Sequence, residues 1–224
     1  MKKPLAVLFD IDETLVHTGG AGGRSWAAAF DDLYGIPADI GQHTSSGETD
    51  PEVGRETFVG VIGRDPEPAE LSKLYARYLW HLADIIHESE GYRVEPGVDA
   101  LLKSLTDAGV VIGVISGAME GAARTKMEPG RLGRYFVFGG YGSDSADRDE
   151  ATRAAIRKAS LLVGHDLAPD EVFVVGDTPH DITSAHAAGA RGIGVATGHY
   201  SADDLEKAGA DAVLADLTEA FPGL

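Results

Sequence analysis

Two aspartates, separated by one residue, follow the first apolar run of the chain. Residues 5–9 are all apolar, and Asp10 and Asp12 come next, followed by Glu13 and Thr14. Side chains two residues apart in an extended chain lie on the same face, and adjacent carboxylates are costly unless a cation or a proton lies between them. The spacing indicates either a cation-binding pair or, more simply, residues that form a turn and a helix cap.

A second pair of aspartates follows another apolar run, at residues 172–175. Asp177 and Asp181 are four residues apart, so a coil after the strand returns both side chains to one side. Asp181 also suits the N-cap of a helix that starts at Ile182. Four convergent carboxylates in a chain without cysteine favour a hard divalent cation, and Mg²⁺ when phosphate is the other ligand.

A third apolar run, residues 110–115, ends in Ser116 and Gly117. A hydroxyl followed by a flexible glycine can present a side-chain donor and a free backbone amide to an anion. The same pair also occurs in ordinary turns. We therefore rest the interpretation on the coincidence of three strand ends that carry suitable groups.

The elements around these residues predict an α/β fold. Short apolar runs typical of strands buried on both faces occur at residues 5–9, 110–115, 135–138, 172–175, 192–195 and 212–214. Helical patterns lie between them, at residues 98–108, 149–163 and 181–188. Alternating strands and helices predict a parallel sheet covered on both faces, with ligands at the carboxyl ends of the strands.

Residues 18–94 contain no strand candidate and show helical patterns at residues 25–34, 51–62 and 67–88. The stretch Gly19-Gly20-Ala21-Gly22-Gly23 opens this segment, and Gly91 with Pro96-Gly97 closes it. We therefore expect two domains, an α/β core formed by residues 1–17 and 95–224 and an all-helical insert formed by residues 18–94.

The composition and charge of the chain exclude several classes of binding partner. The chain has 224 residues with 36 acidic and 19 basic side chains, a formal charge of −17 that repels nucleic acid and anionic membranes. No window approaches the ~20 apolar residues of a membrane span, and the first residues do not form a signal peptide. With no cysteine, thiolate catalysis and disulfides are excluded. We expect a cytoplasmic protein with a small-molecule partner; the oligomeric state is not predicted.

The ordered set of these segments resembles the haloacid dehalogenase (HAD) superfamily over essentially the whole chain. Residues 10–14, 116–117 and 176–181 resemble motifs one, two and four of that superfamily. The helical insert resembles the C1-type cap of the phosphoglycolate phosphatase-like branch, as do residues 18–22 and 46–51. The resemblance implies a Rossmann-like three-layer core with a parallel sheet and an inserted helical cap.

The resemblance also implies roles in a phosphatase that acts on a small phosphorylated metabolite. Asp10 would be the nucleophile that forms an aspartyl-phosphate, and Asp12 would protonate the leaving oxygen and then activate water. Mg²⁺ would bind the Asp10 carboxylate, the backbone carbonyl of Asp12 and Asp177, with Asp181 as a direct or indirect ligand.

Ser116 and the amide of Gly117 would hold phosphate oxygens. Motif three of the family is usually a lysine before motif four, but residues 143–150 contain none. Arg148 is therefore our candidate for the cation that neutralises the phosphate, although a guanidinium is larger than an ammonium and stays charged. Arg153 and Lys158 are alternatives that fit equally well as exposed helix charges.

Substrate specificity is expected to depend on the cap. Phosphoglycolate is the substrate that the resemblance suggests. Candidate contacts in the insert are Arg24, His43, Thr49 and Asp50. His180 is a further candidate because it lies within motif four.

Other activities remain open. A 2-haloacid dehalogenase needs no second acid, so Asp12 argues against it, and a phosphonate hydrolase needs a cap lysine, for which the insert offers only Lys73. A sugar phosphomutase would keep all these motifs, and a pyrophosphatase or nucleotidase would share the fold. A non-catalytic phosphate- or metal-binding regulator is the alternative outside enzymes, and the missing motif-three lysine keeps it open.

Overall fold

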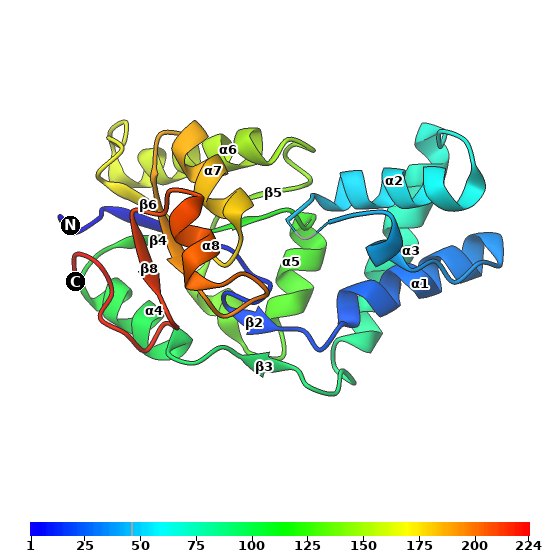
Figure 1. The fold of residues 1–224 in the computed structure, drawn as a ribbon, viewed down its shortest axis with the longest axis horizontal. Helices are drawn as coiled ribbons and strands as arrows, with labels where there is room; N and C mark the ends of the chain where they lie inside the picture. Colours follow the sequence, from blue (N-terminus) through cyan, green and yellow to red (C-terminus); the bar gives the residue numbers. More distant parts are fainter. Residues whose placement is uncertain (46) are drawn as a thin grey trace.

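A parallel sheet forms the centre of the protein in the computed structural model, which describes residues 1–45 and 47–224. Ser46, part of the 46–51 segment compared above, lies outside the described residues. Within them the strand order is β5-β4-β1-β6-β7-β8 (Figure 1). The strands are β1 (Ala6–Phe9), β4 (Val111–Ser116), β5 (Gly139–Tyr141), β6 (Val172–Gly176), β7 (Arg191–Val195) and β8 (Ala212–Leu214). All the neighbouring strands pair in parallel, which confirms the expected α/β class.

Helices cover both faces of the sheet, and the strands are apolar for that reason. Along β1, Ala6 and Leu8 join one buried cluster, and Val7 and Phe9 join another. The first cluster includes alanines of α6 (Arg148–Val163) and α7 (Pro179–Ala187). The second includes residues of α4 (Val98–Asp107) and α5 (Glu120–Met127). Successive side chains of a strand point to opposite faces, so a run buried on both sides shows no polar alternation.

One predicted strand is wrong. Residues 135–138 are not a strand; the chain forms the 3₁₀ helix η2 (Leu132–Tyr135), and β5 starts only at Gly139. A Cβ at Gly140 would collide with the carbonyl oxygen of Ala151 in α6, so this position of the edge strand β5 can hold only glycine. Glycines weaken the apolar signal of a strand, whereas the flanking Phe136 and Val137 imitate one.

The segment between β1 and β4 is mostly helical, as predicted. It contains α1 (Ala21–Tyr34), η1 (Ile40–Gln42), α2 (Asp50–Ile62) and α3 (Pro68–Ile85), and α1–α3 lie to one side of the sheet (Figure 1). Two short strands, β2 (Val16–His17) and β3 (Arg93–Val94), pair antiparallel where the chain enters and leaves this segment. The expectation of no strand in residues 18–94 therefore fails at β3, because two residues are too few to form a recognisable pattern.

We propose that residues 18–94 form a helical cap on a core of residues 1–17 and 95–224. The arrangement in Figure 1 supports this division, with the paired β2 and β3 at its border. The indole of Trp26 stacks on the ring of Tyr78, with centroids 4.1 Å apart and planes 9° apart, so the helical segment has large buried aromatic side chains of its own.

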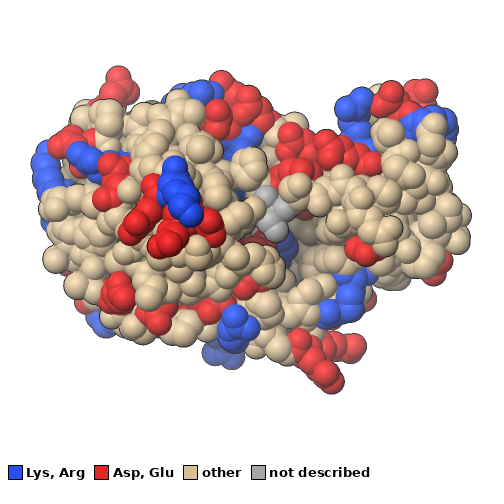
Figure 2. Space-filling model, in the orientation of Figure 1, with Lys and Arg blue, Asp and Glu red and all other residues tan. Residues whose placement is uncertain are grey.

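Acidic and basic side chains are interspersed on the face shown in Figure 2, and a hollow lies between the two parts of the molecule. None of the helices within residues 1–45 and 47–224 combines the length and apolar character needed to span a bilayer.

The aromatic stack gives a test of the packing of the helical segment. Trp26→Ala should lower the free energy of unfolding by ~3–5 kcal/mol, because it leaves a cavity between α1 and α3. Urea unfolding followed by circular dichroism measures the change. The matched control is Trp80→Ala, since Trp80 is 58% exposed, and its effect should stay within ~0.5 kcal/mol. Equal effects of the two substitutions would contradict the packing described here.

Candidate active site

The register of the sheet brings the predicted motifs to one edge. Phe9 of β1 pairs with Val114 of β4 and with Val175 of β6. The chain therefore emerges from three adjacent strands at the same level, and Asp10, Ser116 and Asp177 all line one pocket there. The amide of Asp10 still donates to the carbonyl of Val175, at 2.8 Å, which extends the pairing by one residue and fixes the direction of the Asp10 side chain.

A tight turn after β1 holds Asp12 beside Asp10. The amides of Leu15 and Val16 both donate to the carbonyl of Ile11, and Glu13 adopts a left-handed conformation with φ 58°. Few residues other than glycine adopt this conformation readily. The Thr197 hydroxyl donates to the Glu13 carbonyl at 2.5 Å, so a distant loop supports the turn.

Asp181 is both a helix cap and a site residue. One of its carboxylate oxygens accepts hydrogen bonds from the amide and the hydroxyl of Thr178, at 3.0 and 2.7 Å, in a capping box at the start of α7. Its other oxygen accepts from Arg148 at 2.5 Å. The predicted N-cap position is wrong, because α7 begins at Pro179 and its N-cap is Thr178, which places Asp181 at the third position of the helix. Asp181 nevertheless takes part in the cap and lies in the carboxylate cluster.

Arg148 lies in the pocket, as expected for a motif-three cation. It is the first residue of α6, after the cap residue Asp147. Its Nη2 donates to Asp10 at 2.8 Å and to Asp181 at 2.5 Å. Its Nε is buried and has no hydrogen-bond partner among the described residues. The guanidinium therefore neutralises part of the negative charge of the two carboxylates.

Three buried carboxylates meet without enough positive charge. One oxygen from each of Asp10, Asp177 and Asp181 lies within 4.8 Å of the others. Burial raises the pKa of Asp10 to about 8, with Asp181 adding to the shift against the opposing effect of Arg148. Burial, followed by the charges of Asp10 and Asp181, raises the pKa of Asp177 to about 9. Oxygen ligands of this kind fit a hard divalent cation.

The carboxylate of Asp12 is not among these three. Its Oδ2 accepts a hydrogen bond from the ammonium of Lys126 at 2.5 Å. A role for Asp12 in cation binding therefore falls to its backbone carbonyl, which is the atom that the sequence comparison with the family suggested.

The loop after β4 lies against the helical segment. The amide of Asp50 donates to the carbonyl of Gly117 at 2.8 Å. A Cβ at Gly117 would lie 2.6 Å from the carbonyl oxygen of Glu48 and 3.1 Å from Arg148 Nη1. Only a glycine at position 117 therefore lets these two segments of the backbone approach this closely. The Ser116 hydroxyl accepts from the Ala118 amide at 3.2 Å.

Of the four cap residues proposed as substrate contacts, Asp50 alone lines the pocket. Arg24 instead donates to the Gly19 carbonyl and the Ser89 hydroxyl, and His43 packs against Gly60. The Thr49 hydroxyl donates to the Ala146 carbonyl and caps α2. These three expectations are not supported, because the side chains are used in connections within the fold.

The other residues considered from the sequence also lie outside the pocket. Arg153 pairs with Glu150, and Lys158 pairs with Asp144. His180 lines a neighbouring shallow depression rather than the pocket itself. Lys73 lies on the outer side of α3, next to Trp80, so no lysine of the helical segment is placed for a Schiff base.

Sequence analysis missed Lys126, a buried cation of the pocket. The residue lies on α5, whose buried positions are Ala122, Ala123, Lys126 and Met127. A lysine on an otherwise apolar helical face was the available signal, but α5 itself was not predicted. Further lining residues missed from the sequence are Glu13, Glu48, His199 and Tyr200.

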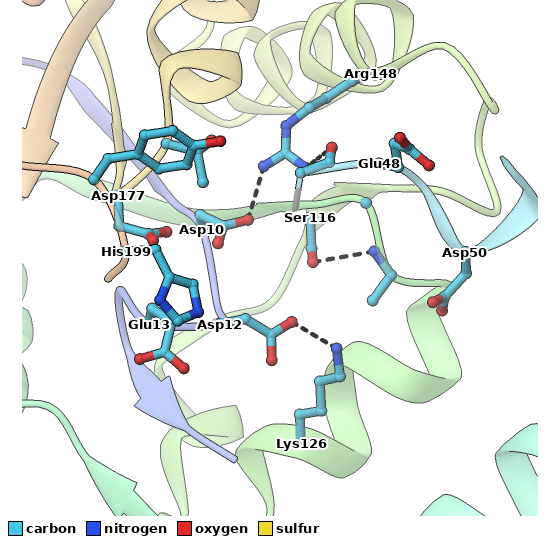
Figure 3. Close-up of a pocket in the computed structure, with 15 residues that line it drawn as sticks. Asp10, Asp12, Glu13, Glu48, Asp50, Ser116, Lys126, Arg148, Asp177 and His199 are labelled. Atoms are coloured by element: carbon cyan, nitrogen blue, oxygen red, sulfur yellow. Dashed lines mark hydrogen bonds and ion pairs between the residues drawn. The ribbon is translucent and has the colours of Figure 1, made fainter. Parts of the chain in front are cut away.

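The pocket as a whole is small and lined mainly by charged residues (Figure 3). Its volume is about 270 Å³, at the lower end of the usual range for ligand sites. Arg148 and Lys126 enter from opposite sides, and Asp10, Asp12 and Ser116 lie between them (Figure 3). The arrangement can position a small anion against a carboxylate nucleophile beside a cation site.

Comparison with known proteins places this site in a family. Residues 148–220 match the HAD-hydrolase-like family model. The chain is 30% identical to a phosphoglycolate phosphatase of Rhodospirillum rubrum over 96% of this chain and 88% of that protein. It is also 30% identical to one of Agrobacterium fabrum, over 99% and 92% of the two chains. The structure of CbbY from Rhodobacter sphaeroides in complex with phosphate superposes with a TM-score of 0.73 at 21% identity, covering 96% of each chain.

The sheet, the strand-end carboxylates and these similarities define a class, and the chain belongs to the HAD-like hydrolases, among their phosphoglycolate phosphatase-like members. It is thus an enzyme of the phosphatase type, which confirms the recognition made from its motifs.

The raised pKa values predict how a divalent cation stabilises the protein. Asp10 and Asp177 bind protons more tightly in the folded than in the unfolded state, so without metal the stability falls as pH rises from ~4 towards ~9. A cation binds the ionised carboxylates, so its stabilising effect should grow over the same range. The increase in Tm on adding Mg²⁺ should be larger at about pH 8 than at about pH 5.

Thermal unfolding with Mg²⁺ or chelator at both pH values measures this effect. Asp177→Asn should abolish most of the response, whereas Asp203→Asn on the exposed side of α8 (Ala202–Lys207) should keep it. An equal shift at both pH values would contradict the assignment of these carboxylates to the cation.

Proposed function

We propose that the protein is a Mg²⁺-dependent phosphatase that hydrolyses a small phosphomonoester, phosphoglycolate or a close analogue, through an aspartyl-phosphate. The observation that carries the proposal is the position of Asp10, which lies against the Arg148 guanidinium, 2.8 Å away, in a cluster of three buried carboxylates. The names of the relatives support the substrate class.

The donor set of the site suits Mg²⁺. Asp10, Asp177 and the Asp12 backbone carbonyl would hold the ion, and Asp181 would act from beside it, because both its oxygens already accept hydrogen bonds. The bound cation would neutralise charge on the phosphate and keep the carboxylates ionised. The positive charge of Arg148 would neutralise the phosphate, with Ser116 and the Gly117 amide beside it.

The chemistry then follows from the side chains. An oxygen of Asp10 attacks phosphorus, the ester P–O bond breaks, and Asp12 gives a proton to the leaving oxygen. A water molecule next attacks the phosphorus of the aspartyl-phosphate, and Asp12 takes its proton. Inorganic phosphate leaves, and both aspartates return to their starting forms.

Loss of the nucleophile tests this mechanism. Asp10→Asn should lower phosphate release by roughly 10⁴-fold or more, because the covalent step is removed while the fold is retained. The measurement is phosphate release from phosphoglycolate, sugar phosphates, nucleoside monophosphates, pyrophosphate and an aryl phosphate, with Mg²⁺ or chelator. Asp203→Asn is the matched control.

The same panel separates the alternatives. Conversion of a sugar phosphate to its isomer without net phosphate release would overturn the proposal in favour of a mutase. Binding of phosphate without turnover of any ester would favour a non-catalytic regulator. Mass spectrometry of acid-quenched enzyme should show one phosphoryl group in the wild type and none in Asp10→Asn.

Arg148 provides a second test, because its proposed role is electrostatic. Arg148→Met should lower kcat/KM by roughly 100–1000-fold, and Arg148→Lys by less, since the charge remains but the planar donor pair is lost. Arg153→Met on the same helix is the control, because Arg153 pairs with Glu150 outside the pocket. An Arg148→Met enzyme with wild-type kcat/KM would show that the guanidinium does not contact the phosphate.

A further inference from the structure

Lys126 is a buried cation that the proposed mechanism does not use. Its side chain is 9% exposed, and its Nζ lies 2.5 Å from Asp12 Oδ2. Its hydrogen bond to a carboxylate is the contact of an ammonium. Asp12 is thus joined to a helix, α5, that carries none of the motifs.

Packing alone does not explain this residue. Ala122, Ala123 and Met127 fill the rest of the buried face of α5, and an apolar side chain would continue it. A buried ion pair is weak grounds for stability, because desolvation offsets most of the attraction and apolar replacements are often neutral or better. A buried ammonium that lines a pocket and is not required for packing indicates a role in binding a ligand.

The surroundings of Lys126 make it the attachment point for an anion at its end of the pocket. Two carboxylates that line the pocket near it, from Asp12 and Asp50, repel negative groups. Arg148 is the other lysine or arginine among the described lining residues, and it lies on the opposite side, beyond Asp10 (Figure 3). Lys126 is therefore the cation that remains for a second anionic group of a ligand whose phosphate lies at Asp10 and Arg148.

We propose that Lys126 binds a carboxylate of the substrate, so that the enzyme selects phosphorylated hydroxy acids over neutral phosphate esters of the same size. The inference rests on the proposed phosphatase function and names the residue that binds the second anionic group of the substrate. The volume of about 270 Å³ limits the separation of the two anionic groups to a few bonds.

Lys126 can hold this carboxylate without leaving Asp12. An ammonium has three N–H donors, and the described residues account for one of them, in the bond to Asp12. The two other donors are available to a planar carboxylate that lies alongside. The stem of the side chain is bounded by α1, since a Cβ at Gly22 would lie 4.0 Å from Lys126 Cε.

The test is the preference between two esters that differ in the carboxylate, 2-phosphoglycolate and ethyl phosphate. Lys126→Met should reduce the ratio of their kcat/KM values by roughly 10–100-fold, mainly through the KM of phosphoglycolate. Any general damage to Asp12 would lower both values and cancel in the ratio. Lys126→Arg should keep part of the preference.

The matched control is Lys103→Met, because Lys103 is an exposed lysine paired with Asp107 on α4. Its ratio should equal that of the wild type. An unchanged ratio in Lys126→Met would overturn the inference, as would a loss that is equal for the two esters. If Lys126→Met does not fold, Lys126→Gln is measured in its place.

Binding measurements separate this inference from the proposed function. In an Asp10→Asn background with Mg²⁺, calorimetry should show that phosphoglycolate binds more tightly than ethyl phosphate, and that Lys126→Met removes the difference. This result decides the role of Lys126 even if no ester is hydrolysed. Failure of all turnover would count against the phosphatase proposal, and equal binding of the two esters against Lys126.

Discussion

The carboxylates of Asp10, Asp177 and Asp181, buried at the end of a parallel sheet, are the constraint on which the rest of the site depends. At separations within 4.8 Å, each charged pair repels by about 3–4 kcal/mol at an effective dielectric constant of ~20. The three pairs together approach the whole stability of a typical domain, ~5–15 kcal/mol. Protons, Arg148 and a divalent cation are the means of keeping such a cluster in a folded chain.

Arg148 and Lys126 share this task in different ways. One nitrogen of Arg148, Nη2, donates hydrogen bonds to both Asp10 and Asp181 and so stabilises the cluster directly. Lys126 pairs with Asp12, whose carboxylate is turned away from the cluster. The structure thereby gives different surroundings to two carboxylates that only one residue separates in sequence, with Asp10 in the carboxylate cluster and Asp12 paired with a lysine.

Much of this arrangement was predictable from the sequence, because strand ends carry their own signals. Apolar runs followed closely by an aspartate or a serine predicted the sheet and the edge at which ligands bind. They also predicted Asp10, Asp177 and Ser116 as residues of that edge. Arg148 could be predicted from its position before motif four. Lys126 could not, since its role depends on the packing of α5 against the turn at Asp12. Arg24 and Thr49 could not be placed for a similar reason, since the Ser89 hydroxyl and the Ala146 carbonyl that they contact are distant in sequence.

The contact between Gly117 and residues 48–50 bears on how this pocket could change over evolution. Its hydrogen bond joins two backbone groups, the Asp50 amide and the Gly117 carbonyl, so it does not depend on which side chains surround it. Mutations at Glu48 or Lys126 therefore leave this backbone hydrogen bond in place, whereas a mutation at Asp50 also removes the bond that its carboxylate accepts from the Met119 amide. The side chains around the pocket can therefore vary more freely than the contact itself, and the position least free to vary is Gly117, where a Cβ would collide with the Glu48 carbonyl.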